Sequence, residues 1–201
     1  GALVAGIIST PFEFERAKNN RAKEGIEKLR KVADGIVLLD NNKLLKFPNL
    51  PLGQSFLVMD KLVADIVKGI TETITQTSLV SLDYADLKTI VTGGCLATVL
   101  YGESNGDAEM VVQDTLSHPM FDVDFKGATG ALVHITGGKN LTIRDAHKIA
   151  SGITKELDAH ANVIWGARID ESYDGKIKVM SIMTGVQSSN TFLSSLSPPY
   201  S

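Results

Sequence analysis

The stretch Ser81-Leu82-Asp83-Tyr84-Ala85-Asp86-Leu87-Lys88-Thr89 decides how this chain is organised. It places two carboxylates, Asp83 and Asp86, between a long apolar-periodic segment and the glycine pair Gly93-Gly94. Asp83 is suited to cap a helix that begins near Tyr84, with Asp86 in the first turn, because carboxylates accept hydrogen bonds from unpaired N–H groups there. Alternatively, two acids in a short loop can orient a water molecule or hold a metal with substrate phosphates. The chain differs in pattern on either side, so we expect this stretch to join two structural units.

Composition excludes several classes of protein. Of the 201 residues, 43% are hydrophobic and 21% are charged, which is typical of a packed core and not of disorder. A net charge of -3 argues against a surface that neutralises nucleic-acid phosphates. The single cysteine, Cys95, excludes an internal disulfide framework and favours a cytoplasmic protein. No apolar run approaches the roughly 18 residues that a membrane-spanning helix needs, so direct membrane insertion is not expected.

The chain before the acidic stretch predicts an α/β unit. An uncharged run over residues 2–9 is typical of a strand buried on both faces, and a helical pattern over 14–33 leads to a second buried strand at 36–39. Strand, helix and strand of these lengths form a parallel crossover. A strand at the very start also indicates that the sequence is a piece of a longer one. Residues 52–74 then predict a helix more than about 30 Å long, followed by a polar exit over 71–78.

The chain after the acidic stretch predicts a sheet with helices on one face. Its expected strands cover 95–103, 131–136, 162–169 and 176–184, and its expected helices cover 107–117 and 141–157. Met110, Val111 and Leu116 are expected to face inward, and Thr142 is expected to cap the second helix. The predicted divisions are therefore residues 1–50, a central helix at 51–75, the joint at 76–90, an α+β unit at 91–190 and a loose tail at 191–201.

Glu15 and Asn41 are the candidate binding residues that the strand pattern supplies. Each follows the end of an expected parallel strand, where ligands bind in open α/β sheets. An amide such as Asn41 can both donate to and accept from a purine edge. The alternatives are a helix-start acid for Glu15 and a turn residue for Asn41. The four histidines are scattered without metal-site spacing and are interpreted as structural or surface residues. The sequence contains no glycine-rich phosphate-binding loop.

Several segments, in order and at matching distances, resemble one family over nearly the whole chain. They are Thr10-Pro11-Phe12, Leu38-Leu39-Asp40-Asn41-Asn42-Lys43-Leu44, Leu82-Asp83-Tyr84-Ala85-Asp86-Leu87-Lys88, Gly127-Ala128-Thr129-Gly130-Ala131, Ile164-Trp165-Gly166-Ala167 and Thr184-Gly185-Val186-Gln187. Together they resemble the FtsZ family, the prokaryotic tubulin homologues, in an archaeal form. The resemblance implies a GTPase that polymerises head to tail, with its phosphate-binding loop upstream of Gly1. Residues 1–50 would then complete a GTP-binding domain, and 91–190 would form the carboxyl-terminal domain.

The resemblance also implies roles for individual residues. The position of Glu15 contacts the ribose of GTP, and the positions of Asn41, Phe56 and Asp60 surround the guanine. The segment 81–86 matches the synergy loop, whose acids, here Asp83 and Asp86, position the attacking water in the pocket of the next subunit. Mg²⁺ is an expected companion of the nucleotide.

The sequence departs from the family pattern in two places. Ser81 stands where the family usually has Asn, which implies slower or altered hydrolysis. The helix after Glu15 is one residue shorter than the family pattern, so the place of a phosphate-side Arg falls on Lys18, or on Asn19 if no gap is allowed. Lys18 keeps the charge but lacks the forked geometry of Arg.

Three readings remain open from the sequence. The first is an assembly-activated GTPase at the division site in the cytoplasm, whose partners are copies of itself and, further, membrane-tethering and division proteins. The second is a divergent polymerising paralogue, such as the cell-shape tubulin homologue CetZ, with weak or no hydrolysis. The third, without any resemblance, is an α/β ligand-binding protein that uses the strand ends near Glu15 and Asn41.

Overall fold

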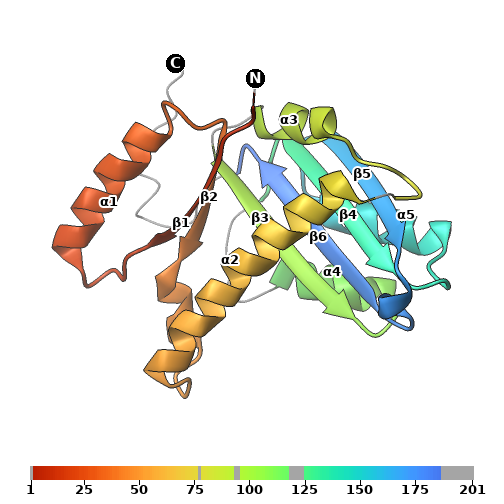
Figure 1. Ribbon diagram of the computed structural model, residues 1–201, viewed down its shortest axis with the longest axis horizontal. Coiled ribbons are helices and arrows are strands. Elements are labelled where there is room, and N and C mark those ends of the chain that lie inside the picture. Colours follow the sequence, from red (N-terminus) through yellow and green to blue (C-terminus); the bar gives the residue numbers. More distant parts are fainter. Residues whose placement is uncertain (1, 77, 93–95, 118–124, 187–201) are drawn as a thin grey trace.

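A computed structural model describes residues 2–76, 78–92, 96–117 and 125–186. The predictions for Cys95, for His118 and for a loose tail at 191–201 lie outside these residues. The described chain forms one six-stranded sheet of order β1-β2-β3-β6-β4-β5 with helices on both faces (Figure 1). The expected α/β class is confirmed, and three of the five strand pairings are parallel.

The predicted parallel crossover is present at the start of the chain. Strands β1 (Ala5–Thr10) and β2 (Gly35–Asp40) pair in parallel, and α1 (Arg16–Leu29) connects them. β2 is buried over most of its length, as predicted. The prediction that the first strand is covered on both faces is wrong for this chain: β1 is the edge strand, and only Thr10 within it is fully buried. The side chains of a strand point to the two faces of the sheet, so those of β1 stay partly exposed where no other element covers a face.

The long central helix, α2 (Leu52–Thr75), crosses one face of the sheet diagonally in front of β3, β6 and β4 (Figure 1). It continues through most of the segment predicted as a polar exit. The hydroxyls of Thr71, Thr73 and Thr75 donate to the carbonyls four residues earlier, at 2.8, 2.8 and 2.7 Å. A threonine whose hydroxyl bonds back to its own helix is compatible with helix despite its β-branch. Gly69 brings this helix into direct contact with the Met180 side chain on the sheet.

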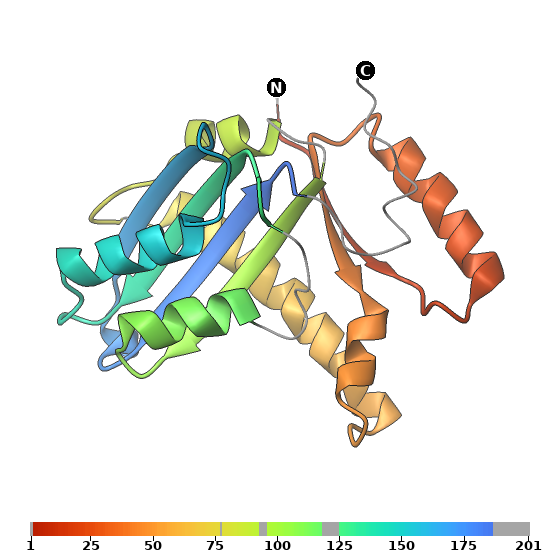
Figure 2. The ribbon, with the colours of Figure 1, turned by 180° about the vertical axis from the view of Figure 1, so that it is seen from behind.

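The second half of the chain completes the sheet. Its elements are β3 (Leu96–Ser104), α4 (Ala108–Ser117), β4 (Gly130–Gly137), α5 (Ile143–Thr154), β5 (Asn162–Ile169) and β6 (Ile177–Thr184). β6 lies antiparallel between β3 and β4, and β5 pairs in parallel with β4 at the far edge. Helices α4 and α5 lie side by side on the face opposite α2 (Figure 2). The sequence predicts helices on only one face of the sheet formed by residues 91–190, but α2 covers the other face of that sheet.

The two predicted units share the sheet at the contact between β2 and β3. This parallel pairing joins two residue pairs, Ile36 with Leu96 and Val37 with Ala97, whereas β3 and β6 pair over eight. The predicted domain boundaries remain a prediction.

The core of the second half lies on both sides of its sheet. Ile135 on β4 and Ile149 on α5 are fully buried, and Thr142 with Asp145 forms the predicted cap of α5 as a reciprocal capping box. Val111 is buried as expected, but Met110 is 60% exposed and the prediction that it faces inward is wrong. Adjacent helix positions point in directions about 100° apart, and in α4 Val111 takes the inward direction while Met110 faces outward.

Candidate functional site

The carboxyl ends of β1 and β2 meet, as expected for parallel strands. Thr10 lies opposite Asp40 in the register. The Asp40 carboxylate accepts hydrogen bonds from the Asn42 N–H at 2.9 Å and from its side-chain amide at 2.7 Å. The Asn42 side-chain oxygen in turn accepts the Glu13 N–H at 2.9 Å. Asn42 therefore joins the two loops that follow the strands, whereas the sequence pattern points to its neighbour Asn41.

Glu15 lies directly before α1, and Lys18 and Asn19 lie in the first turn of that helix. The Glu15 carboxylate accepts the Phe12 N–H at 3.1 Å and pairs with the Lys18 ammonium. The hydrogen bond from Lys18 holds the pKa of Glu15 below its usual range. The Asn19 amide donates to the carbonyls of Phe12 at 2.9 Å and Glu13 at 3.2 Å. The turn is thus fixed by the side chains that the resemblance assigns to a ligand.

The other predicted binding residues come from the next two elements. Asn41 opens the short 3-10 helix η1 (Asn41–Lys46), and Phe56 and Asp60 lie one turn apart on exposed positions of α2. In Figure 1, η1 and the start of α2 lie at the lower end of the molecule, and the loop before α1 lies to their left, beyond the end of β1. The predicted binding residues thus belong to elements on one side of the molecule, at the carboxyl ends of β1 and β2 and the first turns of α2. We call this side the pocket end, after the nucleotide pocket that the resemblance assigns to it.

The acid pair, Asp83 and Asp86, lies at the start of α3 (Tyr84–Thr92). The Asp83 carboxylate accepts the Asp86 N–H at 2.9 Å, and the Asp86 carboxylate accepts the Asp83 N–H at 2.9 Å. This reciprocal arrangement confirms the predicted helix cap. Asp83 is exposed and Asp86 partly exposed, while Leu82 beside them is 5% exposed. The buried leucine turns inward, so the acid pair is presented on the surface.

The acid pair and the pocket end are separated by the central helix. α2 has 24 residues, and at a rise of 1.5 Å per residue it is about 36 Å long. The pocket end lies at its first turns, whereas α3 lies beyond its last turn, at the upper side of Figure 1. Within one molecule the acids cannot reach a ligand bound at the pocket end.

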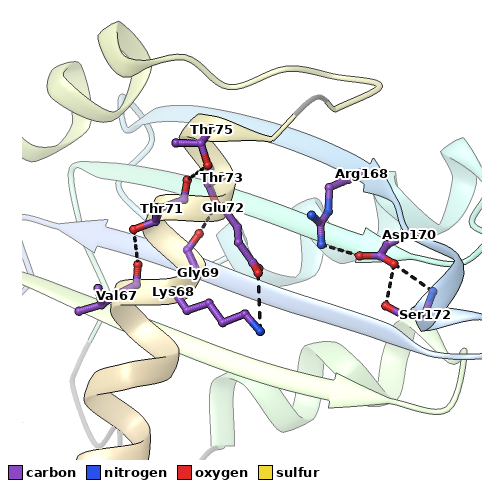
Figure 3. A network of polar contacts seen from close by, with 10 residues as sticks. All are labelled: Val67, Lys68, Gly69, Thr71, Glu72, Thr73, Thr75, Arg168, Asp170 and Ser172. Carbon is purple, nitrogen blue, oxygen red and sulfur yellow. Dashed lines mark hydrogen bonds and ion pairs between the residues drawn. The ribbon is translucent and has the colours of Figure 1, made fainter.

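A layer of polar side chains runs along the last turns of α2 and the nearby end of β5 (Figure 3). Glu72 on α2 pairs with Lys68 at 3.7 Å, and Arg168 on β5 pairs with Asp170 at 2.8 Å. Hydrogen bonds from the Ser172 hydroxyl and N–H hold the pKa of Asp170 low. His134 on β4 belongs to this layer, and burial, reinforced by the charges of Arg168 and Lys178 and opposed by Glu72, lowers its pKa to about 4.

The protein is expected to lose stability as the pH falls from 6.5 to 4. The unfolded chain takes up a proton on His134 near its ordinary pKa of 6.5, whereas the folded chain does so only near 4. The full difference corresponds to about 3 kcal/mol of unfolding free energy, which is present above pH 6.5 and lost towards pH 4. Urea unfolding at pH 7.0, 5.5 and 4.5 measures it. The His134→Gln variant is the control and should show a flatter pH dependence; equal slopes in both proteins would contradict this assignment.

Two further features concern every described part of the chain: a metal site and a membrane-spanning helix. No group of three or more His, Cys, Asp or Glu side chains within the described residues could hold a metal ion. Within the same residues, no helix is both long and apolar enough to cross a membrane.

Comparison with known proteins identifies relatives of this fold. The model of the FtsZ family, C-terminal domain, matches residues 95–187. Cell division protein FtsZ 2 of Halobacterium salinarum is 58% identical over 191 residues, which cover 94% of this chain and 49% of that protein. Cell division protein FtsZ 2 of Methanocaldococcus jannaschii is 51% identical over 196 residues, covering 94% and 52%. The chain thus spans about half the length of these curated relatives.

Solved structures agree with the sequence matches. An empty FtsZ dimer from M. jannaschii superposes with a TM-score of 0.83 at 38% identity, over 92% of this chain and 55% of that one. CetZ from Methanosaeta thermophila superposes with a TM-score of 0.73 over 91% and 52%, but at 21% identity it shows the shared fold alone. Residues 95–187 thus match the carboxyl-terminal domain of the FtsZ family, and the chain is similar to archaeal FtsZ proteins over more than nine tenths of its length.

Proposed function

We propose that the full-length polypeptide containing this chain is a GTPase of the tubulin type that assembles head to tail, and that each subunit supplies Asp83 and Asp86 to the GTP bound by its neighbour. The observation that carries the proposal is the separation of the acid pair from the pocket end by the whole length of α2. Two half-sites at opposite ends of a molecule form a complete site only when copies stack in one direction, which is the geometry of a filament.

The chemistry suits acids that arrive by assembly. Phosphoryl transfer depends on positioning and on electrostatic stabilisation more than on covalent steps. Asp83 and Asp86 are exposed enough to meet a neighbouring molecule, and their mutual hydrogen bonds fix their carboxylates in place. We assign them the orientation and polarisation of the attacking water. Mg²⁺, if it takes part, would be held mainly by the phosphates, in keeping with its usual sites.

The pocket end suits one face of a nucleotide. We assign Glu15 to the ribose hydroxyls and Asn41, Phe56 and Asp60 to the base, with Lys18 or Asn19 towards the phosphates. Phe56 is 46% exposed at the first turns of α2, as an aromatic ring that stacks on a ligand would be. The loops after β1 and β2 are already joined through Asn42, so this half of the pocket is preformed.

The relatives support filament assembly and a role in division. Those named above are cell division proteins, and the solved FtsZ neighbour is a dimer. We therefore extend the proposal to assembly at the division site, with membrane-tethering and division proteins as further partners. The higher identity to FtsZ than to CetZ favours division over cell shape.

One observation favours slower hydrolysis than the family pattern implies. Ser81 replaces the usual Asn, and its hydroxyl donates to the Ser78 carbonyl at 3.1 Å, within its own segment. Ser81 has no side-chain amide to order water in the neighbouring pocket. Its hydroxyl does not replace the amide, because it is already bonded within its own segment. A polymerising paralogue with weak hydrolysis is therefore the second candidate.

GTP turnover per molecule of the full-length protein should rise steeply with protein concentration, because each complete site needs two molecules. Phosphate release, measured over a hundredfold range of concentration and normalised to protein, tests this directly. GTP binding, measured by filtration at the same concentrations, serves as the control and should stay nearly constant per molecule. A flat turnover per molecule would contradict the shared site and favour a ligand-binding protein that acts alone.

A further inference from the structure

The segment that precedes the acid pair, residues 78–82, lies beside the edge strand β5 of the sheet. The Val80 N–H donates to the Ala167 carbonyl at 3.2 Å, and the Ala167 N–H donates to the Val80 carbonyl at 3.1 Å. The two residues form an antiparallel bridge, and Ala167 belongs to the edge strand β5. We call residues 78–82 the linking segment. Val80 is therefore hydrogen-bonded to β5 in the way that a residue of a further strand would be.

Gly166 brings the linking segment against β5 a second time. A Cβ added at Gly166 would lie 2.6 Å from Leu82 Cγ and 2.7 Å from the Val80 carbonyl oxygen. Real Cβ atoms do not approach other heavy atoms this closely, and the Val80 oxygen belongs to backbone that cannot rotate away. Any larger residue at this position would push the linking segment off the strand.

These two contacts determine where the acid pair lies. Leu82 packs against Gly166 and is directly followed by Asp83, and Asp83 is hydrogen-bonded to Asp86. No other residue lies between the contact with β5 and the first acid.

We infer that Gly166 and Ala167 are positioning residues for hydrolysis, which hold the linking segment so that the acid pair meets the neighbouring subunit at a fixed place. The inference rests on the proposed function, because it matters only if the acids act on the GTP of a neighbour. Misplacement of a reacting group by about 1 Å can lower a rate by up to a hundredfold. Small shifts of the linking segment should therefore reduce turnover while the pocket end, beyond the other end of α2, is unaffected.

Ala167→Pro removes the hydrogen bond that the Ala167 N–H donates to the Val80 carbonyl, one of the two in the bridge, and leaves the pairing of β5 with β4 in place. The Asn162 and Asp170 N–H groups donate to Thr129 and Gly137 at 2.9 Å, on the β4 side. N–H groups alternate in direction along a strand, so those of Val163 and Ala167 both point to the open edge. Proline is tolerated at such positions of an edge strand. Val163→Pro is thus a matched control at the other end of β5.

In the full-length protein, Ala167→Pro should lower kcat for GTP about tenfold or more, with KM and filament mass in sedimentation unchanged. Val163→Pro should keep wild-type kcat. Gly166→Ala displaces the same segment without proline and should also lower kcat; circular dichroism and thermal unfolding verify the fold of each variant. A merely structural role of β5 would change both proline variants alike.

Wild-type kcat in folded Ala167→Pro or folded Gly166→Ala would overturn the inference, and so would equal losses in both proline variants. The Asp86→Ala variant, assayed beside them, separates this failure from failure of the proposed function. If Asp86→Ala hydrolyses GTP normally, the proposal that two subunits share one site is itself wrong. If Asp86→Ala is inactive and Ala167→Pro is fully active, only the positioning role is wrong.

Discussion

Asp86→Ala in the full-length protein is expected to lower GTP hydrolysis by about a hundredfold or more and to leave GTP binding nearly unchanged. The carboxylate belongs to the acid pair, and the pocket end lies beyond the far end of α2. Removing it therefore takes away a group that acts on the water without disturbing the groups that bind the nucleotide. Phosphate release and equilibrium binding of GTP, measured on the same preparation, separate the two effects.

Asp86 also accepts the Asp83 N–H, so its removal weakens the cap of α3, which typically costs about 1 kcal/mol. Asp145→Ala is the matched control, because Asp145 has the same place in the capping box of α5. It should lose similar stability and retain hydrolysis. Asp86→Ala should also reduce the turnover of wild-type protein when the two assemble together, since wild-type pockets then face neighbours without the acid. Loss of GTP binding in Asp86→Ala, or normal hydrolysis, would contradict the assignment.

Ile135→Ala is expected to reduce the unfolding free energy by about 2–5 kcal/mol. Ile135 lies in β4, between β5 and β6, and is fully buried at 0% exposure. Truncation leaves a cavity in a region where every residue of the strand is buried, so the surroundings can collapse only partly. Urea unfolding followed by circular dichroism measures the loss.

Ile143→Ala makes the same chemical change on the surface and is the control. Ile143 is the first residue of α5 and is 74% exposed. Its truncation should change the unfolding free energy by no more than about 0.5 kcal/mol. Similar losses for the two variants would mean that β4 is not at the centre of the core.

The elements that the sequence predicted well are those that local pattern determines. The apolar spacing of residues 52–74, the cap at Thr142 and the reciprocal acids Asp83 and Asp86 all depend on neighbours within a few residues. The parallel crossover follows from the alternation of strand, helix and strand. Each of these is formed as predicted.

The features that the sequence did not predict depend on contacts between distant parts of the chain. The bridge of Val80 with Ala167 joins residues far apart in sequence, and nothing local marks either of them. The position of α2 across the second face of the sheet likewise depends on tertiary contacts. Met110 was assigned to the core because it is apolar, although its neighbour Val111 occupies the inward position.

The candidate site was predicted partly by pattern and partly by resemblance. Strand ends indicated Glu15 and Asn41, while Phe56, Asp60 and Lys18 came from the resemblance alone. The structure brings these residues to the pocket end of the molecule, and their ligand contacts remain predictions. Asn42, which joins the two loops, follows another asparagine, and no property of the sequence distinguishes the two.

The most direct test of the shared site is to mix two variants that are each inactive. Asp86→Ala keeps its pocket and loses its acid, whereas Asn41→Ala is expected to lose GTP binding and to keep its acid. In equimolar co-assembled filaments, verified by sedimentation, about a quarter of the junctions combine an intact pocket with an intact acid pair. Phosphate release should then recover to about a quarter of the wild-type rate. A mixture that assembles and stays as inactive as its separate components would contradict the claim that the acids act on the neighbouring subunit.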